Sequence, residues 1–63
     1  MGYTVKIREN SYECVNSFEI GGVLSTFGIS ENDKENIVDW AEYACVGEVY
    51  EDGFEGIYIV RNY

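Results

Sequence analysis

The chain has no histidine and no proline, and only four of its 63 residues are lysine or arginine. Without histidine it lacks the usual general base near neutral pH and every arrangement in which an imidazole activates Ser or Cys. It also has no Cys-x-x-Cys pair, no ordered calcium loop and no glycine-rich phosphate-binding motif. We therefore expect a protein that is not an enzyme and that holds neither a metal nor a cofactor.

Long apolar runs are missing as well. No segment approaches the roughly 20 apolar residues of a membrane-spanning helix, and the N-terminus lacks the charged and apolar regions of a signal peptide. Twelve Asp and Glu residues leave a formal net charge of −8. Phosphate backbones and anionic lipid surfaces repel such a chain. We expect a cytoplasmic protein that contacts neither a membrane nor nucleic acid directly.

Cysteine is scarce too, with only Cys14 and Cys45 present. These two could form one bridge, but disulfide frameworks usually involve four or more cysteines in a short secreted chain. We expect two reduced, partly buried thiols in a cytosolic protein.

The size of the chain limits its core. A domain of about 60 residues buries only about 60% of its unfolded surface, which leaves a marginal core. Yet 46% of the residues are apolar and 16% aromatic, which is too much for a disordered chain. We expect one compact domain over residues 1–63, either oligomeric or bound to a larger partner.

Two β-hairpins are predicted, one near each end. Residues 3–8 alternate between apolar and polar side chains, the pattern of a half-buried strand, and a turn at 9–11 leads to a second strand at 12–15. Near the C-terminus, Asp52-Gly53 is a dipeptide typical of hairpin turns. The run after it places Ile57 and Ile59 on one face of a strand and Tyr58 and Val60 on the other.

Residues 17–28 are ambiguous. Their apolar side chains fit either a helix or short strands, but Gly21-Gly22 would cost a helix about 1 kcal/mol per glycine relative to alanine. We predict an extended segment broken at the glycine pair, with a short helix as the alternative.

A single amphipathic helix is the clearest element. Ser30 or Asn32 can cap it, acidic residues in its first turn suit the helix dipole, and Gly47 is placed to end it. Trp40 flanks its apolar stripe as the largest anchor. The stripe consists of Ile37, Val38, Ala41, Ala44 and Cys45. Together these elements predict an α+β domain, a small antiparallel sheet of three to four short strands with one helix packed on it.

Acidic residues are distributed unevenly: residues 35–60 contain seven of them and no basic residue. One helix face, opposite the apolar stripe, is expected to carry Glu31, Glu35, Asp39 and Glu42. A second cluster surrounds the predicted C-terminal hairpin and consists of Glu48, Glu51, Asp52 and Glu55. Such faces often serve only solubility. Two patches of one sign without counterions favour a surface that meets a basic partner.

Six tyrosines form a second unusual set. We assign Tyr3 and Tyr58 to the core. Tyr43 and Tyr50 lie among the carboxylates, where amphipathic tyrosines are typical of protein interfaces. A surface of tyrosines and carboxylates can stack on and pair with arginines that would otherwise hold phosphates.

The acidic residues of 31–42 and 48–55 make the chain resemble small inhibitors encoded by phages and mobile elements, the anti-CRISPR and antirestriction proteins that act as DNA mimics. The run 39–43, Asp-Trp-Ala-Glu-Tyr, is similar to acidic-aromatic helices of antirestriction proteins. The resemblance implies a protein of the host cytosol that occupies the basic nucleic-acid-binding surface of a host defence nuclease. Two alternatives remain: a homodimeric structural or regulatory domain that associates through exposed aromatics, and an antitoxin-like protein that neutralises a basic partner.

Overall fold

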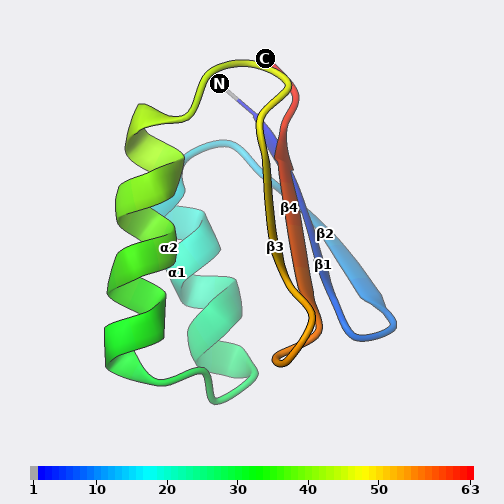
Figure 1. Ribbon diagram of the computed structural model, residues 1–63, viewed down its shortest axis with the longest axis vertical. Helices are drawn as coiled ribbons and strands as arrows, with labels where there is room; N and C mark the ends of the chain where they lie inside the picture. Colours follow the sequence, from blue (N-terminus) through cyan, green and yellow to red (C-terminus); the bar gives the residue numbers. More distant parts are fainter. Residues whose placement is uncertain (1) are drawn as a thin grey trace.

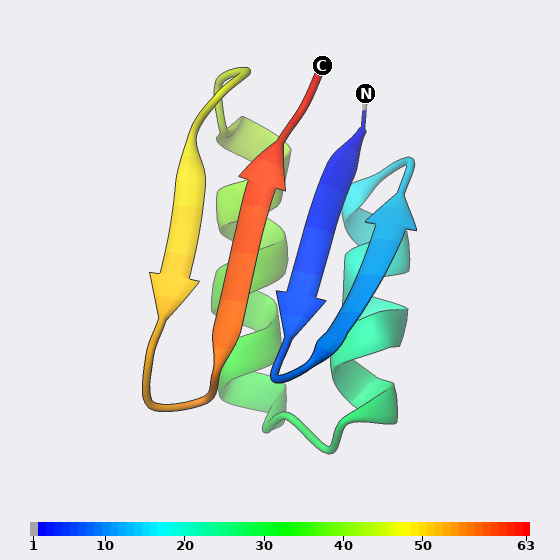
Figure 2. The ribbon, with the colours of Figure 1, turned by 90° about the vertical axis from the view of Figure 1, so that its right-hand side faces the viewer.

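The computed structural model describes residues 2–63. They form two layers, a four-stranded antiparallel sheet with order β2-β1-β4-β3 and a pair of helices that covers one face of it (Figures 1 and 2). In chain order the elements are β1 (Tyr3–Ile7), β2 (Asn10–Cys14), α1 (Ser17–Thr26), α2 (Glu31–Tyr43), β3 (Val49–Asp52) and β4 (Ile57–Arg61). The predicted α+β class is confirmed, with two helices where the sequence predicted one.

The core lies between the sheet and the helices. The central strands β1 and β4 supply alternate residues to it, with Val5 paired to Ile59 and Ile7 paired to Ile57. This confirms the predicted faces of β4. Tyr3 is also fully buried, as predicted, and its hydroxyl donates a hydrogen bond of 2.6 Å to the carbonyl oxygen of Ala41 in α2. This bond ties the sheet directly to α2.

Both predicted hairpins are present, with turns that differ in detail. The first turn is the pair Arg8-Glu9 rather than residues 9–11, and Arg8 has a positive φ of 56°. The second hairpin joins β3 to β4 through residues 53–56. Its turn is held by Asp52, whose Oδ1 accepts hydrogen bonds from the backbone N–H groups of Phe54 and Glu55 at 3.0 and 3.2 Å. A carboxylate that satisfies two turn amides in this way explains why Asp is favoured there.

Residues 17–26 are helical, so the extended segment predicted for this region is wrong and the helical alternative is right. Asn16 caps α1 by accepting a bond of 2.8 Å from the N–H of Glu19, while the Glu19 carboxylate accepts one of 2.8 Å from the N–H of Val15. Ile20 and Leu24 are buried against the sheet. Capping and burial together outweigh the cost of the two glycines, because helices in proteins owe more to packing than to propensity.

A tight connection joins the helices. Gly28 has a φ of 72° and donates to the Ser25 carbonyl, and the Ile29 N–H donates to the Leu24 carbonyl. These two bonds form the Schellman motif that ends α1. Ser30 then caps α2, as predicted, by accepting from the N–H of Asp33. The two helices therefore form a short hairpin, with α2 running back beside α1 (Figure 1).

The end of α2 differs from the prediction. The helix stops at Tyr43, and Ala44 is already extended, so Gly47 does not cap it. Gly47 lies in the following loop with a φ of 91° and donates to the Arg61 carbonyl at 2.8 Å. The glycine predicted as a helix stop therefore fixes the entry into β3 instead.

Of the two cysteines, Cys14 is buried in the core cluster and Cys45 is exposed in the loop after α2, and both are free thiols. Burial raises the pKa of Cys14, and the nearby carboxylates of Glu19 and Glu13 raise it further. Neither helix within residues 2–63 has the length and apolar character needed to cross a bilayer.

Candidate protein-binding surface

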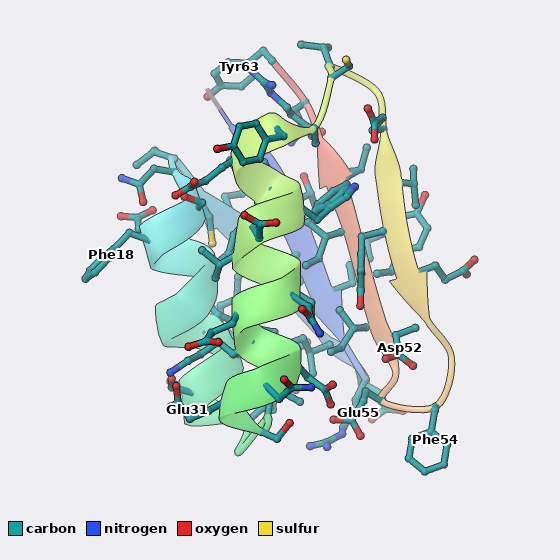
Figure 3. The ribbon with its side chains drawn as sticks, turned by 60° about the vertical axis from the view of Figure 1, so that its left-hand side comes forward. Phe18, Glu31, Asp52, Phe54, Glu55 and Tyr63 are labelled. Atoms are coloured by element: carbon teal, nitrogen blue, oxygen red, sulfur yellow. The ribbon has the colours of Figure 1, made fainter. Side chains whose placement is uncertain are left out.

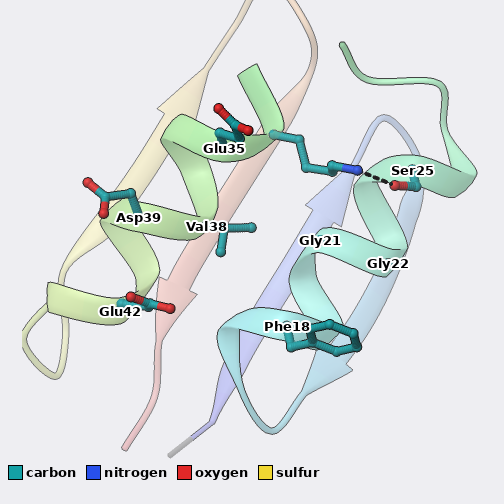
Figure 4. Close-up of a pocket in the computed structure, with 9 residues that line it drawn as sticks. Phe18, Gly21, Gly22, Ser25, Glu35, Val38, Asp39 and Glu42 are labelled. Atoms are coloured by element: carbon teal, nitrogen blue, oxygen red, sulfur yellow. Dashed lines mark hydrogen bonds between the residues drawn. The ribbon is translucent and has the colours of Figure 1, made fainter. Parts of the chain in front are cut away.

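A groove runs between α1 and α2 on the outer side of the helix layer (Figure 4). Its volume is about 480 Å³. Gly21 and Gly22 of α1 and Val38 of α2 line it, and Phe18 stands beside it with 85% of its surface exposed. The glycines leave this side of α1 without side chains, so backbone is exposed where most helices would carry bulk.

Three carboxylates from α2, those of Glu35, Asp39 and Glu42, line the groove and are all exposed. We call them the carboxylate rim. The sequence placed this row opposite the apolar stripe of the helix. It does lie away from the buried Ile37 and Ala41, but it borders an apolar groove rather than open solvent.

The fourth predicted member of this row, Glu31, is neutralised. Its carboxylate forms an ion pair of 2.8 Å with the Nζ of Lys34, which also donates a hydrogen bond of 3.0 Å to the hydroxyl of Ser25 in α1 (Figure 4). Lys34 therefore bridges the two helices at the end of the groove near Ser25. The carboxylates without a paired cation, those of the carboxylate rim, lie along the rest of the groove.

The orientation of the rim follows from how α2 is anchored. Ile37 and Ala41 are fully buried, and the Tyr3 hydroxyl bond holds the Ala41 carbonyl. In a helix, a residue four positions from another lies on nearly the same face. Fixing Ile37 and Ala41 against the sheet therefore turns Glu35, Asp39 and Glu42 outward.

The second predicted cluster is divided by the sheet. The Glu48 carboxylate accepts a hydrogen bond of 3.0 Å from the Cys45 N–H, which lowers the pKa of Glu48. Asp52 is engaged in the hairpin turn, and Glu55 in the same turn is half-buried. Glu51 points to the opposite side of the sheet from the helices, since it pairs with Tyr58. Figure 3 shows Asp52 and Glu55 at the hairpin, on the opposite side of α2 from Phe18. These four residues form no common patch with the rim.

The two tyrosines predicted to bind a partner have different environments. Tyr43 lies at the end of α2 with 78% of its surface exposed. Tyr50 instead faces the helix layer, half-buried, with its ring 5.5 Å from that of Trp40. Burial raises the pKa of Tyr50, with Asp52 and Asp33 adding to the effect. Tyr50 thus packs at the edge of the core, where its ring is not free to stack on a partner.

The four basic side chains are all engaged within the molecule. Lys6 lies over the ring of Tyr58 and Arg8 over that of Phe27, each 5.9 Å from the ring centre. Arg61 donates to the Ala44 carbonyl, and Lys34 makes the ion pair already described. Within residues 2–63, the Lys34–Glu31 pair is the one salt bridge, so none of these cations neutralises the rim.

Opposite the helices, the sheet presents a second surface, which we call the open sheet face. Tyr58 lies on it, 38% exposed, so its predicted place in the core is wrong. The reason is the strand alternation itself: Ile57 and Ile59 take the inward positions. Cross-strand pairing puts on the same face Thr4, Lys6, Ser11, Glu13, Val49, Glu51 and Val60.

Sequence reasoning did not find the groove because it favoured an extended segment over the helical alternative at residues 17–28. Once residues 17–26 are taken as helical, Phe18, Gly21, Gly22 and Ser25 share a face, three or four residues apart. The available sequence signal for the groove was an aromatic residue, Phe18, three and four positions before a glycine pair.

No known protein family, curated protein or solved structure matches the chain. Among residues 2–63, no three Asp, Glu or Cys side chains gather in an arrangement that could hold a metal ion.

Proposed function

We propose that this protein is a non-enzymatic inhibitor that binds the basic nucleic-acid-binding surface of a defence nuclease. The carboxylate rim on α2 would take the place of nucleic-acid phosphates. The observation that supports this proposal is the rim itself: Glu35, Asp39 and Glu42 are exposed in one row, and no lysine or arginine of residues 2–63 pairs with them. An acidic surface left uncompensated in this way is complementary to a cationic groove.

The spacing of the rim is compatible with this role. Glu35 and Glu42 are seven residues apart, which is about 10 Å along a helix that rises about 1.5 Å per residue. The rim therefore carries about one charge every 5 Å. A DNA strand carries one phosphate about every 3.4 Å of axis. The rim is thus a sparser line of charge than a DNA strand, and it offers about two thirds as many contacts over the same length.

The net charge of −8 would act before contact is made. Complementary charge speeds the diffusional encounter of two proteins, and salt weakens this effect because the screening length is about 8 Å at physiological ionic strength. Tyr43, exposed at the end of α2, would stack on an arginine at the edge of the contact.

The test is a DNA-cleavage and DNA-binding competition assay on a panel of purified CRISPR effector and restriction nucleases. We expect inhibition of at least one nuclease, competitive with DNA and weaker at high salt. The triple variant Glu35→Lys/Asp39→Lys/Glu42→Lys should lose it, because each exposed ion pair is worth up to about 1 kcal/mol and reversal replaces attraction by repulsion. Full inhibition by a correctly folded triple variant would show that the rim is not the contact surface. Inhibition of no nuclease would contradict the nuclease as target.

A second candidate function is a homodimeric interaction domain, and the open sheet face favours it. This face carries one cation, Lys6, and two carboxylates, Glu13 and Glu51, so its formal charge is about −1 while the whole chain has −8. Two copies would repel each other least there. Light scattering coupled to size exclusion, at low and high salt, would support this function if it showed a dimer that salt does not dissociate.

A further inference from the structure

We propose that the groove between α1 and α2 is the docking site for a cationic amphipathic helix of the partner. The proposal rests on the proposed function for its charged component, the carboxylate rim. It adds an apolar contact, a defined partner structure and a position at which binding can be blocked without any change of charge.

The apolar side of the groove is the first argument. Gly21 lies so close to α2 that a Cβ built on it would be 3.4 Å from the Cγ2 of Val38, whereas a Cβ on Gly22 would meet nothing within 4 Å. Gly21 therefore faces α2 and touches Val38, whereas Gly22 faces open space on the outer side of the helix. This leaves a trough beside Val38 in which apolar side chains of a third helix can lie between the two.

Phe18 is the second argument. It is a large aromatic side chain on a helix, 85% exposed, and it lines the groove (Figure 4). The outward position of this ring is not explained by the core, which takes Ile20 and Leu24 from the same helix. Exposed aromatics beside an apolar groove are typical of binding sites, where they become buried on association.

Charge selects the kind of helix. Along α2, Glu35 and Asp39 are about 6 Å apart in height and Asp39 and Glu42 about 4.5 Å, from the rise per residue. Lysines or arginines at positions i, i+4 and i+7 of a facing helix have the same spacing. Apolar side chains on the neighbouring face of that helix would enter the trough, which is the helix-in-groove mode of recognition. Lys34, at the Ser25 end, would repel a cation and so limits the contact to the length of the rim.

The experiment uses two synthetic helical peptides with the same number of arginines. In the first, leucines occupy one face beside the arginines, and in the second those leucines are replaced by glutamines. We expect the leucine peptide to bind the full-length protein at least tenfold more tightly in calorimetric titration. In NMR titration, we expect its largest shifts at the amides of Phe18, Gly22 and Val38.

The decisive variant is Gly22→Leu, which adds bulk to the groove and leaves the net charge unchanged. It should fold, because a Cβ at this position meets no neighbouring atom and leucine favours helix over glycine. We expect it to weaken the leucine peptide about tenfold or more and the glutamine peptide hardly at all. Gly22→Ala is the matched control, with a side chain too small to fill the trough. Phe18→Ser, which removes an exposed ring, should weaken the leucine peptide without affecting the fold.

Two results would overturn the docking site: equal binding of the leucine and glutamine peptides, or equal binding of the leucine peptide by Gly22→Leu and the unmodified protein. Either result would mean that the peptides bind through charge attraction alone and that the apolar groove contributes nothing. The outcome is separable from that of the proposed function. If Gly22→Leu inhibits a nuclease normally and the triple rim variant does not, the docking site fails and the inhibitor function stands. If no nuclease is inhibited but the leucine peptide binds and Gly22→Leu blocks it, the docking site stands and the nuclease as target fails.

Discussion

The helix layer and the open sheet face are the two large surfaces of this small domain, and they differ in how their charged side chains are arranged. On the helix layer, Glu35, Asp39 and Glu42 stand in one row with no cation paired to them. On the open sheet face, Lys6 lies over the ring of Tyr58 and on a strand next to that of Glu13. The difference shows that the net charge of −8 is concentrated by layer and not spread evenly over the molecule.

The periodicities of the two layers explain this difference. An alternating strand places residues two apart on one face, and cross-strand pairing sets Lys6 beside Ser11 and Tyr58, so no two charged side chains of the open sheet face are paired directly. A helix brings residues three and four apart together, so a sequence with acids at 35, 39 and 42 must concentrate them. Like charges at this spacing destabilise a helix by about 0.2–0.5 kcal/mol per pair. Contact with the proposed basic partner would relieve this repulsion, which is otherwise a cost to the stability of a small domain.

The strongest way to break the comparison is to remove two negative charges from each layer in turn. Asp39→Lys/Glu42→Lys on the helix layer and Glu13→Lys/Glu51→Lys on the open sheet face both change the formal net charge from −8 to about −4, because each reversal adds two positive charges. We expect the first variant to lose about 100-fold in affinity for the basic partner and the second less than about threefold, measured by titration at fixed salt. Equal losses would mean that only the total charge matters, and that the layers do not differ in function.

Tyr58→Ser tests the other surface. Serine removes the ring on which Lys6 lies and the largest apolar side chain of the open sheet face. If this face forms a dimer, we expect the dimer to weaken about tenfold or more in sedimentation equilibrium, since buried aromatics dominate interface energies. Binding of a basic partner to the rim should stay within about twofold. A parallel loss of partner binding would show that the sheet, and not the helix layer, makes the contact.

The smallest effect should come from Lys34→Ala. This change removes the cation that bridges the helices and frees the Glu31 carboxylate, so the uncompensated row grows from three acids to four. We expect about a threefold gain in affinity for the basic partner at low salt, which vanishes at high salt as screening increases. Thermal unfolding of the variant serves as its control, because the loss of the Ser25 bond should change stability only slightly. An affinity that falls would show that Lys34 itself contacts the partner.

Several features of the fold could be predicted because their causes are local. The hairpin at Asp52-Gly53 and the helix start at Ser30 both rest on hydrogen bonds between residues a few positions apart, and both are confirmed. The inward faces of Ile57 and Ile59 follow from strand alternation alone. In each of these cases one residue and its near neighbours determine the geometry.

Three differences from the sequence predictions depend on partners far away in the chain, whereas the turn at Arg8-Glu9 and the outward position of Tyr58 have local causes. The glycine pair of α1 favours extended structure when the sequence is considered alone. The burial of Ile20 and Leu24 outweighs this preference, and these side chains are buried only because the sheet packs against the helix. Tyr50 looked like a contact residue among acids, but strand pairing turns it onto Trp40. α2 ends at Tyr43 and not at Gly47, and the Gly47 N–H donates instead to the carbonyl of Arg61 in β4.

The excess of acid, its spacing along α2 and the absence of histidine are properties of the chain alone, and they direct the functional argument to a basic partner. Tertiary structure decided which acids act together. It separated Glu51 and Asp52 from the rim and placed the rim beside an apolar groove. The physical reason is that helical and strand periods assign a residue to a face of its own element. Only the packing of one element on another decides what that face meets.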